Sequence, residues 1–171
     1  MKLRTELWNS IEKMLEYIVV RILHLQFTEE ARSSILQFVK FGIVGATNTA
    51  VSYIVNILTI WVLSKRAVPW DYVAGNIMAF VVGTAWSYIW NNRFVFTVRA
   101  GENRNPFLTL FKTYISYAFT GIVLNNILSY FWISVLGISK YIAPLINLLI
   151  SVPVNFLINK YWTFKTAKEV Q

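Results

Sequence analysis

The stretch FGIVGATNTAVSYIVNILTIWVLS, residues 41–64, lies between Lys40 and Lys65 and contains no charged residue. An α-helix rises about 1.5 Å per residue, so this stretch is long enough to cross the ~30 Å hydrocarbon core of a bilayer. Its length and apolar composition predict a transmembrane helix. This stretch decides the fold class because further stretches of similar length and apolar composition follow it.

Three further charge-free stretches follow, and each is closed by Lys, Arg or Asp. They cover residues 72–92, 113–139 and 141–159. As a helix, even the shortest of them is about 30 Å long. The sequence therefore predicts an all-α integral membrane protein with four transmembrane helices.

The basic residues are distributed unevenly over the regions that connect these stretches. Only Lys65, Arg66 and Lys140 fall in the first and third loops, whereas the N-terminal arm, the central loop and the C-terminal tail hold every other Lys and Arg. Because basic loops stay in the cytoplasm, we expect both termini and the central loop to be cytoplasmic. The formal net charge of +8 then favours contact with anionic membrane lipids. It does not indicate nucleic-acid binding, because the charges sit at span ends and not on one soluble face.

The sequence lacks the residues that most catalytic and cofactor sites require. It has no cysteine and a single histidine, His24, so neither a thiolate nucleophile nor a Cys- or His-based metal site is expected. No acid falls inside a charge-free stretch, and no Gly-rich phosphate loop is present. Acid/base catalysis, proton coupling and nucleotide hydrolysis are therefore not expected. We expect a protein that is not an enzyme and that has no catalytic residue, cofactor or metal ion.

Residues 1–35 differ from the rest of the chain, because charges are mixed there with apolar residues at helical spacing. The apolar residues are Leu7, Ile11, Met14, Leu15, Ile18, Ile22 and Leu25. This pattern predicts an amphipathic helix at the membrane interface, with Trp8 as an anchor among the headgroups. Packing of this arm on a partner protein is the alternative. Thr28 followed by Glu29 and Glu30 predicts a helix start, with an N-cap side chain and acids in the first turn.

The second and fourth stretches end in the same pattern. YIWNNRFVF at residues 88–96 and FLINKYWTF at residues 156–164 both run aromatic, aliphatic, any, Asn, any, any, aromatic, β-branched, Phe. The first and third stretches are likewise preceded by Lys40 and Lys112. We therefore expect two tandem helical hairpins of the same orientation, related by a pseudo-twofold axis along the membrane normal.

Polar and small residues inside the four stretches recur at steps of four. The sets, from first stretch to fourth, are Asn48, Ser52 and Asn56; Gly83, Ser87 and Asn91; Tyr117, Gly121, Asn125 and Ser129; and Asn147, Ser151, Asn155 and Asn159. Residues four apart share a helix face, so each helix has one face that lipid should not contact. These faces suit interhelical hydrogen bonds, worth about 0.6–2 kcal/mol each. They equally suit a hydrophilic groove that passes a sugar or phosphate headgroup.

Two of these asparagines lie close to a cation at the membrane edge. Asn91 is followed by Arg93, and Asn159 is followed by Lys160. Guanidinium and ammonium groups are the usual protein partners of phosphate. For this pair of asparagines, contact with a phosphate or a sugar is therefore favoured over a purely structural role.

Residues 35–165 resemble the GtrA-like family of small four-span membrane proteins. The resemblance rests on QFVKFGIVGATNT at residues 37–49 and on the two Asn-containing endings quoted above. It divides the chain into an arm (1–35), a transmembrane domain (36–165) and a cytoplasmic tail (166–171). Asn92 departs from the pattern, since the family often has Arg or Lys there, as Lys160 does in the second copy. The two phosphate contacts are therefore expected to differ.

The resemblance implies work on a polyprenyl-phosphate monosaccharide in the bacterial cytoplasmic membrane, beside a membrane glycosyltransferase. The expected function is flipping of this lipid, without an energy source of its own, for glycosylation of envelope polysaccharide or teichoic acid. The expected lipid-phosphate and sugar contacts are Lys40, Asn48, Ser87, Asn91, Arg93, Lys112, Asn125, Asn155, Asn159 and Lys160. The alternative is a non-transporting subunit that anchors a glycosyltransferase, as the small subunit of dolichol-phosphate-mannose synthase does. Four spans enclose little volume, so a homodimer or a complex is also expected.

Overall fold

The computed structural model describes residues 28–66, 70–98 and 101–166, together with Ser10, Lys13, Met14 and Tyr17. Within this part of the chain, every regular element is helical. Four segments are long and apolar enough to cross a membrane: Glu29–Ser64, Asp71–Val95, Pro106–Val135 and Ala143–Thr163. The prediction of an all-α protein with four transmembrane helices is confirmed. The amphipathic helix predicted in residues 1–35 lies almost wholly outside the described residues.

Three of the four segments contain π-helical turns. The first segment is the single helix α2 (Glu29–Ser64), and the second joins α3 (Asp71–Trp90) to the π-helix η2 (Asn91–Val95). The third consists of α4 (Pro106–Ala118), η3 (Phe119–Leu124), α5 (Asn125–Tyr130) and η4 (Phe131–Val135). The fourth joins α6 (Ala143–Ile158) to η5 (Asn159–Thr163).

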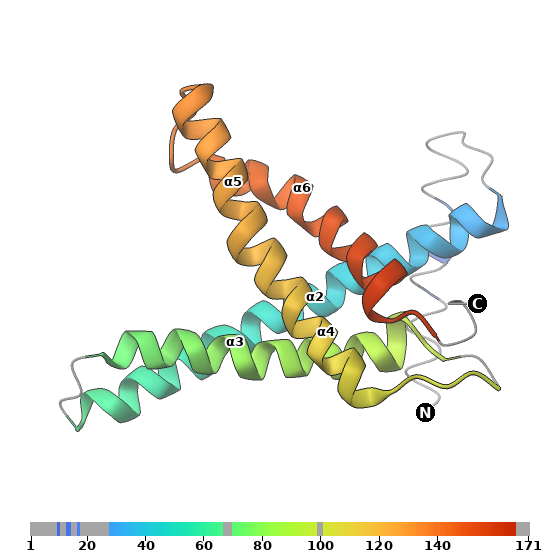
Figure 1. Cartoon of the computed structure of the whole chain (residues 1–171), viewed down its shortest axis with the longest axis horizontal. Helices are drawn as coiled ribbons and strands as arrows, with labels where there is room; N and C mark the ends of the chain where they lie inside the picture. The colour runs from blue at the N-terminus through green and yellow to red at the C-terminus, as the bar shows by residue number, and fades with distance from the viewer. Residues whose placement is uncertain are drawn as a thin grey trace. The chain divides into compact units, whose positions relative to one another are not determined.

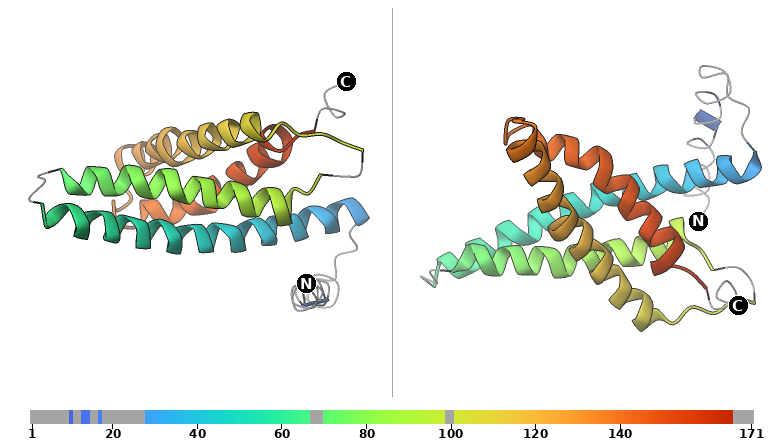
Figure 2. Two further views of the ribbon diagram at one scale, coloured as in Figure 1. Left: turned by 90° about the horizontal axis from the view of Figure 1, so that it is seen from below. Right: turned by 45° about the horizontal axis from the view of Figure 1, so that its top comes forward.

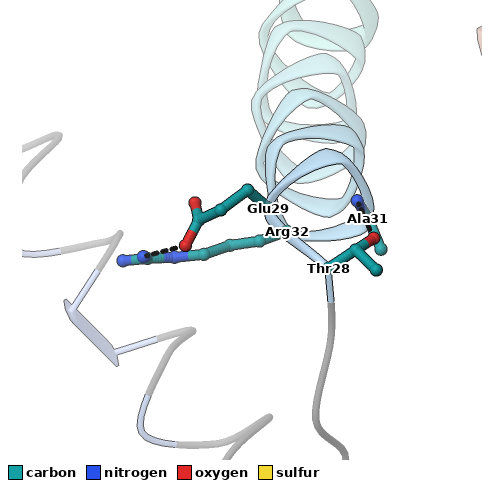
Figure 3. A network of polar contacts seen from close by, with 4 residues as sticks. All are labelled: Thr28, Glu29, Ala31 and Arg32. Carbon is teal, nitrogen blue, oxygen red and sulfur yellow. Dashed lines mark hydrogen bonds and ion pairs between the residues drawn. The ribbon is translucent and has the colours of Figure 1, made fainter.

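The start of α2 is capped as its sequence predicts. The Thr28 hydroxyl accepts a hydrogen bond from the Ala31 N–H at 3.3 Å, and Arg32 lies 3.8 Å from Glu29 (Figure 3). Because neither Gly nor Pro interrupts residues 29–41, the helix continues from this cap into the first charge-free stretch. The boundary drawn between residues 35 and 36 consequently falls inside α2.

The third segment also differs from its charge-free stretch at both ends. It begins at Pro106, upstream of Lys112, because Pro suits the first turn of a helix and the Asn105 side chain caps the Leu108 N–H at 3.1 Å. It ends at Val135, because Gly137 has φ of 68°, a left-handed conformation that favours glycine. A charge-free stretch therefore locates a span without fixing where its helix ends.

The chain forms two compact units, residues 1–40 and residues 41–171. In the second unit, α2 and α3 lie side by side and antiparallel (Figures 1 and 2). Towards one end of this first pair, the Asn56 side-chain amide donates to the Asn76 side-chain oxygen Oδ1 at 3.0 Å. Further along, the helices touch at Gly83, where an added Cβ would overlap the Ser52 hydroxyl and lie 2.7 Å from the Asn48 oxygen. A small residue is required there for the two backbones to approach.

The third segment and α6 make the second antiparallel pair (Figure 1). Asn147 joins the two helices, because its amide donates to the Ser129 hydroxyl at 2.8 Å and accepts from the Trp132 indole at 3.1 Å. At the opposite end of the pair, the Ser116 and Thr163 hydroxyls are 2.7 Å apart. The second pair lies across the first in Figures 1 and 2.

The two repeated endings adopt the same structure. Each contains a π turn, closed by a hydrogen bond from Phe96 N–H to Asn91 C=O (2.8 Å) in the first copy and from Phe164 N–H to Asn159 C=O (2.9 Å) in the second. The sequence repeat is therefore a structural repeat as well.

Aromatic side chains pack the two endings around each other. Phe96 and Phe164, which occupy equivalent positions, stack with ring centroids 4.8 Å apart. Phe96 also contacts Phe156 at 5.9 Å, and Phe164 contacts Tyr88 at 6.3 Å. Because Tyr88 and Phe156 are equivalent too, these two contacts exchange when the copies are exchanged. This reciprocity is what a local pseudo-twofold arrangement produces.

Candidate functional site

A cavity of about 380 Å³ lies in the second unit, between α2, the third segment and α6. Its lining residues are Phe41, Gly42, Gly45, Ala46, Asn48 and Thr49 from α2; Tyr117, Thr120, Gly121 and Asn125 from the third segment; and Ser151, Val152 and Asn155 from α6. It is bounded by three of the four membrane-crossing segments.

Small residues hollow out the α2 wall. An added Cβ at Gly42 or Gly45 would meet no atom within 4 Å. At Gly83, by contrast, an added Cβ would clash, so glycine has two different roles in this protein. At Gly83 the missing side chain permits helix contact, whereas at Gly42 and Gly45 it leaves space.

A π turn shapes the second wall. In a regular α-helix, residues at steps of four drift round the axis by about 40° per step. The π-helix η3 accommodates an extra residue between Tyr117 and Asn125, which offsets this drift and keeps both residues in the lining. Asn125 donates weakly to the Gly121 carbonyl at 3.4 Å, and its buried Oδ1 accepts no hydrogen bond from the described residues.

The third wall presents Ser151 and Asn155 of α6. Asn155 is held from behind by Asn159, whose amide donates to the Asn155 backbone oxygen at 2.7 Å and to its side-chain oxygen at 2.9 Å. Asn159 itself is completely buried and does not line the cavity. Its position orients Asn155, one turn further into the membrane-crossing segment.

Tyr117 connects this cavity to the second segment. Its hydroxyl lies 2.8 Å from the Ser87 hydroxyl and accepts from the Asn91 amide at 3.3 Å, and it also interacts with the Asn155 side chain. Ser87 and Asn91 are completely buried behind this tyrosine. Asn48, Asn125 and Asn155 of the expected contacts thus meet at one cavity, while Ser87, Asn91 and Asn159 form a supporting network behind it.

The expected phosphate contacts occupy a different place. Arg93 is exposed in η2, and the Lys112 ammonium donates to the Trp162 carbonyl of η5 at 3.4 Å. Lys160 lies in η5, with its ammonium 5.4 Å from the Tyr161 ring centre. Because the endings that carry η2 and η5 pack together, these three cations share one end of the second unit. They do not line the cavity, and Lys40 belongs to the other unit.

Arg104 is a fourth cation at this end, and it was not predicted as a site residue from the sequence. Its guanidinium donates to the Asn92 side chain at 2.8 Å and to the Phe96 carbonyl at 2.7 Å, and it faces the Phe164 ring at 5.3 Å. It therefore ties the loop before α4 to both repeated endings. A lone loop arginine gives no sequence signal for such a role.

A second polar face of the third segment, on α4 and η3, was also missed, although its spacing is visible in the sequence. Thr109, Thr113, Ser116 and Thr120 are all buried, and each donates its hydroxyl hydrogen to the carbonyl four residues earlier. Because each hydroxyl has a hydrogen-bond partner within its own helix, burying it costs little free energy. Only Thr120 reaches the cavity.

The cavity is uncharged, is lined by apolar as well as polar atoms, and is partly open at its edge. Among the described residues that line it there is no Asp, Glu, Lys, Arg or His. Gly42, Ala46, Thr49 and Gly121 are exposed, so the edge between α2 and the third segment faces the surroundings of the protein. In a membrane those surroundings are lipid, and a lipid whose headgroup occupies the cavity can leave its chain outside.

Comparison with known proteins gives one match. The model of the GtrA/DPMS transmembrane domain family matches residues 40–164. No curated protein and no solved structure matches the chain. The matched range includes the cavity and both repeated endings.

Proposed function

The chain belongs to the GtrA/DPMS transmembrane domain family, and from this premise we propose that it flips a polyprenyl-phosphate-linked monosaccharide across the bacterial cytoplasmic membrane. Membership of this family supports a membrane function that involves polyprenyl-phosphate sugars. We add the proposal that this function is flipping, and that it serves glycosylation of envelope polysaccharide or teichoic acid.

The cavity between α2, the third segment and α6 is the observation that carries this proposal. Transfer of a sugar through hydrocarbon is unfavourable because its hydroxyls lose their hydrogen bonds to water. Asn48, Asn125 and Asn155 offer replacement partners within membrane-crossing segments. The exposed edge at Thr49 and Gly121 leaves room for the polyprenyl chain to stay in lipid.

The phosphate is assigned in this proposal to the end where Arg93, Lys112 and Lys160 gather. Asn155, in the cavity, precedes Asn159, beside that end, by four residues, which is about 6 Å of helix rise. A phosphate held at the cations can therefore place its sugar in the cavity. Lys40, which precedes the first span as Lys112 precedes the third, is included as a further cation at the membrane surface.

Transport is proposed to be equilibrative and the chain not to be an enzyme. The sequence has no acid between Asp71 and Glu102 or between Glu102 and Glu169. Proton coupling through an intramembrane acid therefore has no residue to use. Consumption of the lipid-linked sugar on the far side gives the process its direction, and a membrane glycosyltransferase supplies the sugar on the near side.

The proposed orientation and organisation follow the charge pattern. The cationic end and both termini lie in the cytoplasm, and the two helix pairs are the two hairpins of a tandem repeat. We propose residues 36–165 as the transmembrane domain, residues 1–35 as an interfacial arm whose last part, from Glu29, belongs to α2, and residues 166–171 as a tail. A homodimer would enclose the headgroup more fully than one chain does.

The competing function is a subunit that anchors or stabilises a glycosyltransferase without transport. The family name supports it, since it groups GtrA with the transmembrane domain of DPMS. The two functions differ in whether the purified chain alone moves lipid.

The test is transport of a fluorescent short-chain prenyl-phosphate glucose in liposomes that contain only this protein. The variant Arg93→Gln with Lys160→Gln should lower the transport rate at least about tenfold, because each cation is worth about 1.5–3 kcal/mol when it bonds a charged group. Lys65→Gln with Lys140→Gln removes the same charge from the other loops and should leave the rate within about twofold. Absence of transport by the unmodified chain, with retained co-purification of a glycosyltransferase, would support the anchoring subunit instead.

A further inference from the structure

No charged side chain lines the cavity among the described residues, and this restricts what it can bind. We propose that it is a single site for one electrically neutral monosaccharide, and that it excludes sugars that carry a carboxylate. This inference rests on the proposed function, because it assumes that the sugar of the lipid enters the cavity.

Charge is the first restriction. No acidic or basic residue lines the cavity among the described residues, and its walls belong to membrane-crossing helices. A carboxylate placed there would lose its hydration without gaining a counter-ion. The cations at Arg93, Lys112 and Lys160 are already assigned to the lipid phosphate, which every such lipid carries. Discrimination against a uronic acid therefore falls to the cavity itself.

Hydrogen-bonding capacity is the second restriction. The lining offers amides at Asn48, Asn125 and Asn155 and hydroxyls at Thr49 and Ser151. Sugar hydroxyls both donate and accept, so they match amides and hydroxyls, whereas a carboxylate can only accept.

The repeat explains why there is one site and not two. Lys40 and Lys112 occupy equivalent positions, so Gly42 and Gly45 of the cavity correspond to Tyr114 and Tyr117 in the second copy. Tyr114 donates to the Val81 carbonyl at 2.7 Å, and the Tyr117 hydroxyl lies 2.8 Å from Ser87. Both tyrosines thus pack on α3, in the place that mirrors the cavity. The glycines of the first copy leave a cavity, whereas the tyrosines at the equivalent positions of the second copy occupy the corresponding space.

The inference is tested by binding, which does not require flipping. The probes are two short-chain prenyl-phosphate sugars, one glucosyl and one glucuronyl, titrated onto the full chain in nanodiscs. They share the phosphate and the chain, so their affinity ratio reports only the sugar. We expect the glucosyl lipid to bind at least about tenfold more tightly, with one bound per chain. Equal affinities, or two bound per chain, would overturn the inference.

Two variants separate the cavity from general effects. Gly45→Tyr copies the equivalent Tyr117 into open space, and it should abolish discrimination by filling the cavity. Ile54→Tyr adds the same ring to an exposed position of the same helix and should change neither affinity. Thr49→Lys places a cation on the exposed edge of the cavity, and it should raise the glucuronyl affinity relative to glucosyl about tenfold even if Gly45→Tyr fails to fold. An unchanged ratio in Thr49→Lys contradicts the assignment.

The outcome is independent of the transport result. Selective binding without transport would overturn flipping and keep the neutral-sugar site. Transport of both lipids with equal binding would keep flipping and overturn the site.

Discussion

Asparagines at the same spacing have different environments in this protein. Asn147 uses its whole amide to join two helices, through Ser129, Trp132 and the Asn125 backbone oxygen. Asn155 lines the cavity, although it lies on the same helix and on the same stripe. The predicted interhelical hydrogen bonds are therefore present at Asn147, whereas contact with a sugar stays a prediction for Asn155 of the same stripe.

These two asparagines give a matched pair for mutation. Asn147→Leu should destabilise the protein by about 1–3 kcal/mol, because it leaves the Trp132 N–H without its partner and removes the bonds to Ser129 and to the Asn125 backbone oxygen. Asn155→Leu removes the side-chain bonds to Asn159 and Tyr117, but it should destabilise the protein less than Asn147→Leu, since Asn159 keeps its 2.7 Å bond to the Asn155 backbone oxygen. It should lower transport per mole of protein at least about tenfold. Thermal unfolding in detergent and transport in liposomes measure the two effects. If Asn155→Leu lost stability and transport in proportion, its role would be structural.

At the scale of elements, three of the four π-helices η2 to η5 lie in the repeated endings or in the cavity wall. Both repeated endings contain one, and η3 forms part of the cavity wall. A π turn holds one residue more than the α-helix around it. Removing that residue should therefore restore an α-helix without turning the residues beyond it.

Deletion of single isoleucines tests this directly. Ile122 in η3 and Ile127 in α5 are both 60% exposed, so neither deletion removes core packing. Deletion of Ile122 should give a folded, monodisperse protein, because Ser129 and Asn147 keep their alignment. Deletion of Ile127 should not, because it turns the rest of the third segment by about 100° against α6. Size-exclusion profiles of the two variants provide the measurement, and equal behaviour of both would show that η3 does not absorb the deletion.

For the whole molecule, the decisive feature is that the cations of η2, η5 and α4 share one end. Contacts of Arg104 with Asn92 and Phe96, and of Lys112 with Trp162, assemble that end from three segments. If it faces the cytoplasm, the lipid phosphate is collected on the side where nucleotide sugars are used to make it. The direction of the proposed transport thus depends on the orientation of the chain.

Orientation can be measured by cysteine labelling, because the chain has no cysteine of its own. Asn103 and Ser139 are exposed at opposite ends of the third segment. A membrane-impermeant maleimide should label Asn103→Cys only from the cytoplasmic side and Ser139→Cys only from outside, since basic residues concentrate around residue 103. The reverse pattern would move the cationic end to the outside and reverse the proposed direction.

The sequence by itself determined the features that depend on local composition. The four charge-free stretches were enough to predict four transmembrane helices. A segment that crosses a bilayer must satisfy its backbone hydrogen bonds internally, and a single helix does so. The Thr28 cap and the two repeated endings were likewise visible, since each depends on a few neighbouring residues. The ends of the helices were less accessible, because a helix continues past the membrane edge until a residue such as Gly137 stops it.

Only the tertiary structure decided which polar residues surround a cavity. Asn48 and Asn56 share a stripe on α2, yet Asn48 lines the cavity and Asn56 bonds to Asn76. The difference arises because the third segment and α6 leave a space beside Asn48, whereas Asn56 meets the Asn76 side chain of α3. Gly45 and Tyr117 occupy equivalent positions in the two copies, but Gly45 leaves space whereas Tyr117 fills it. This difference is visible only when the two copies pack together. Periodicity defines the face of a helix, but the distance between helices decides whether that face is joined or left open.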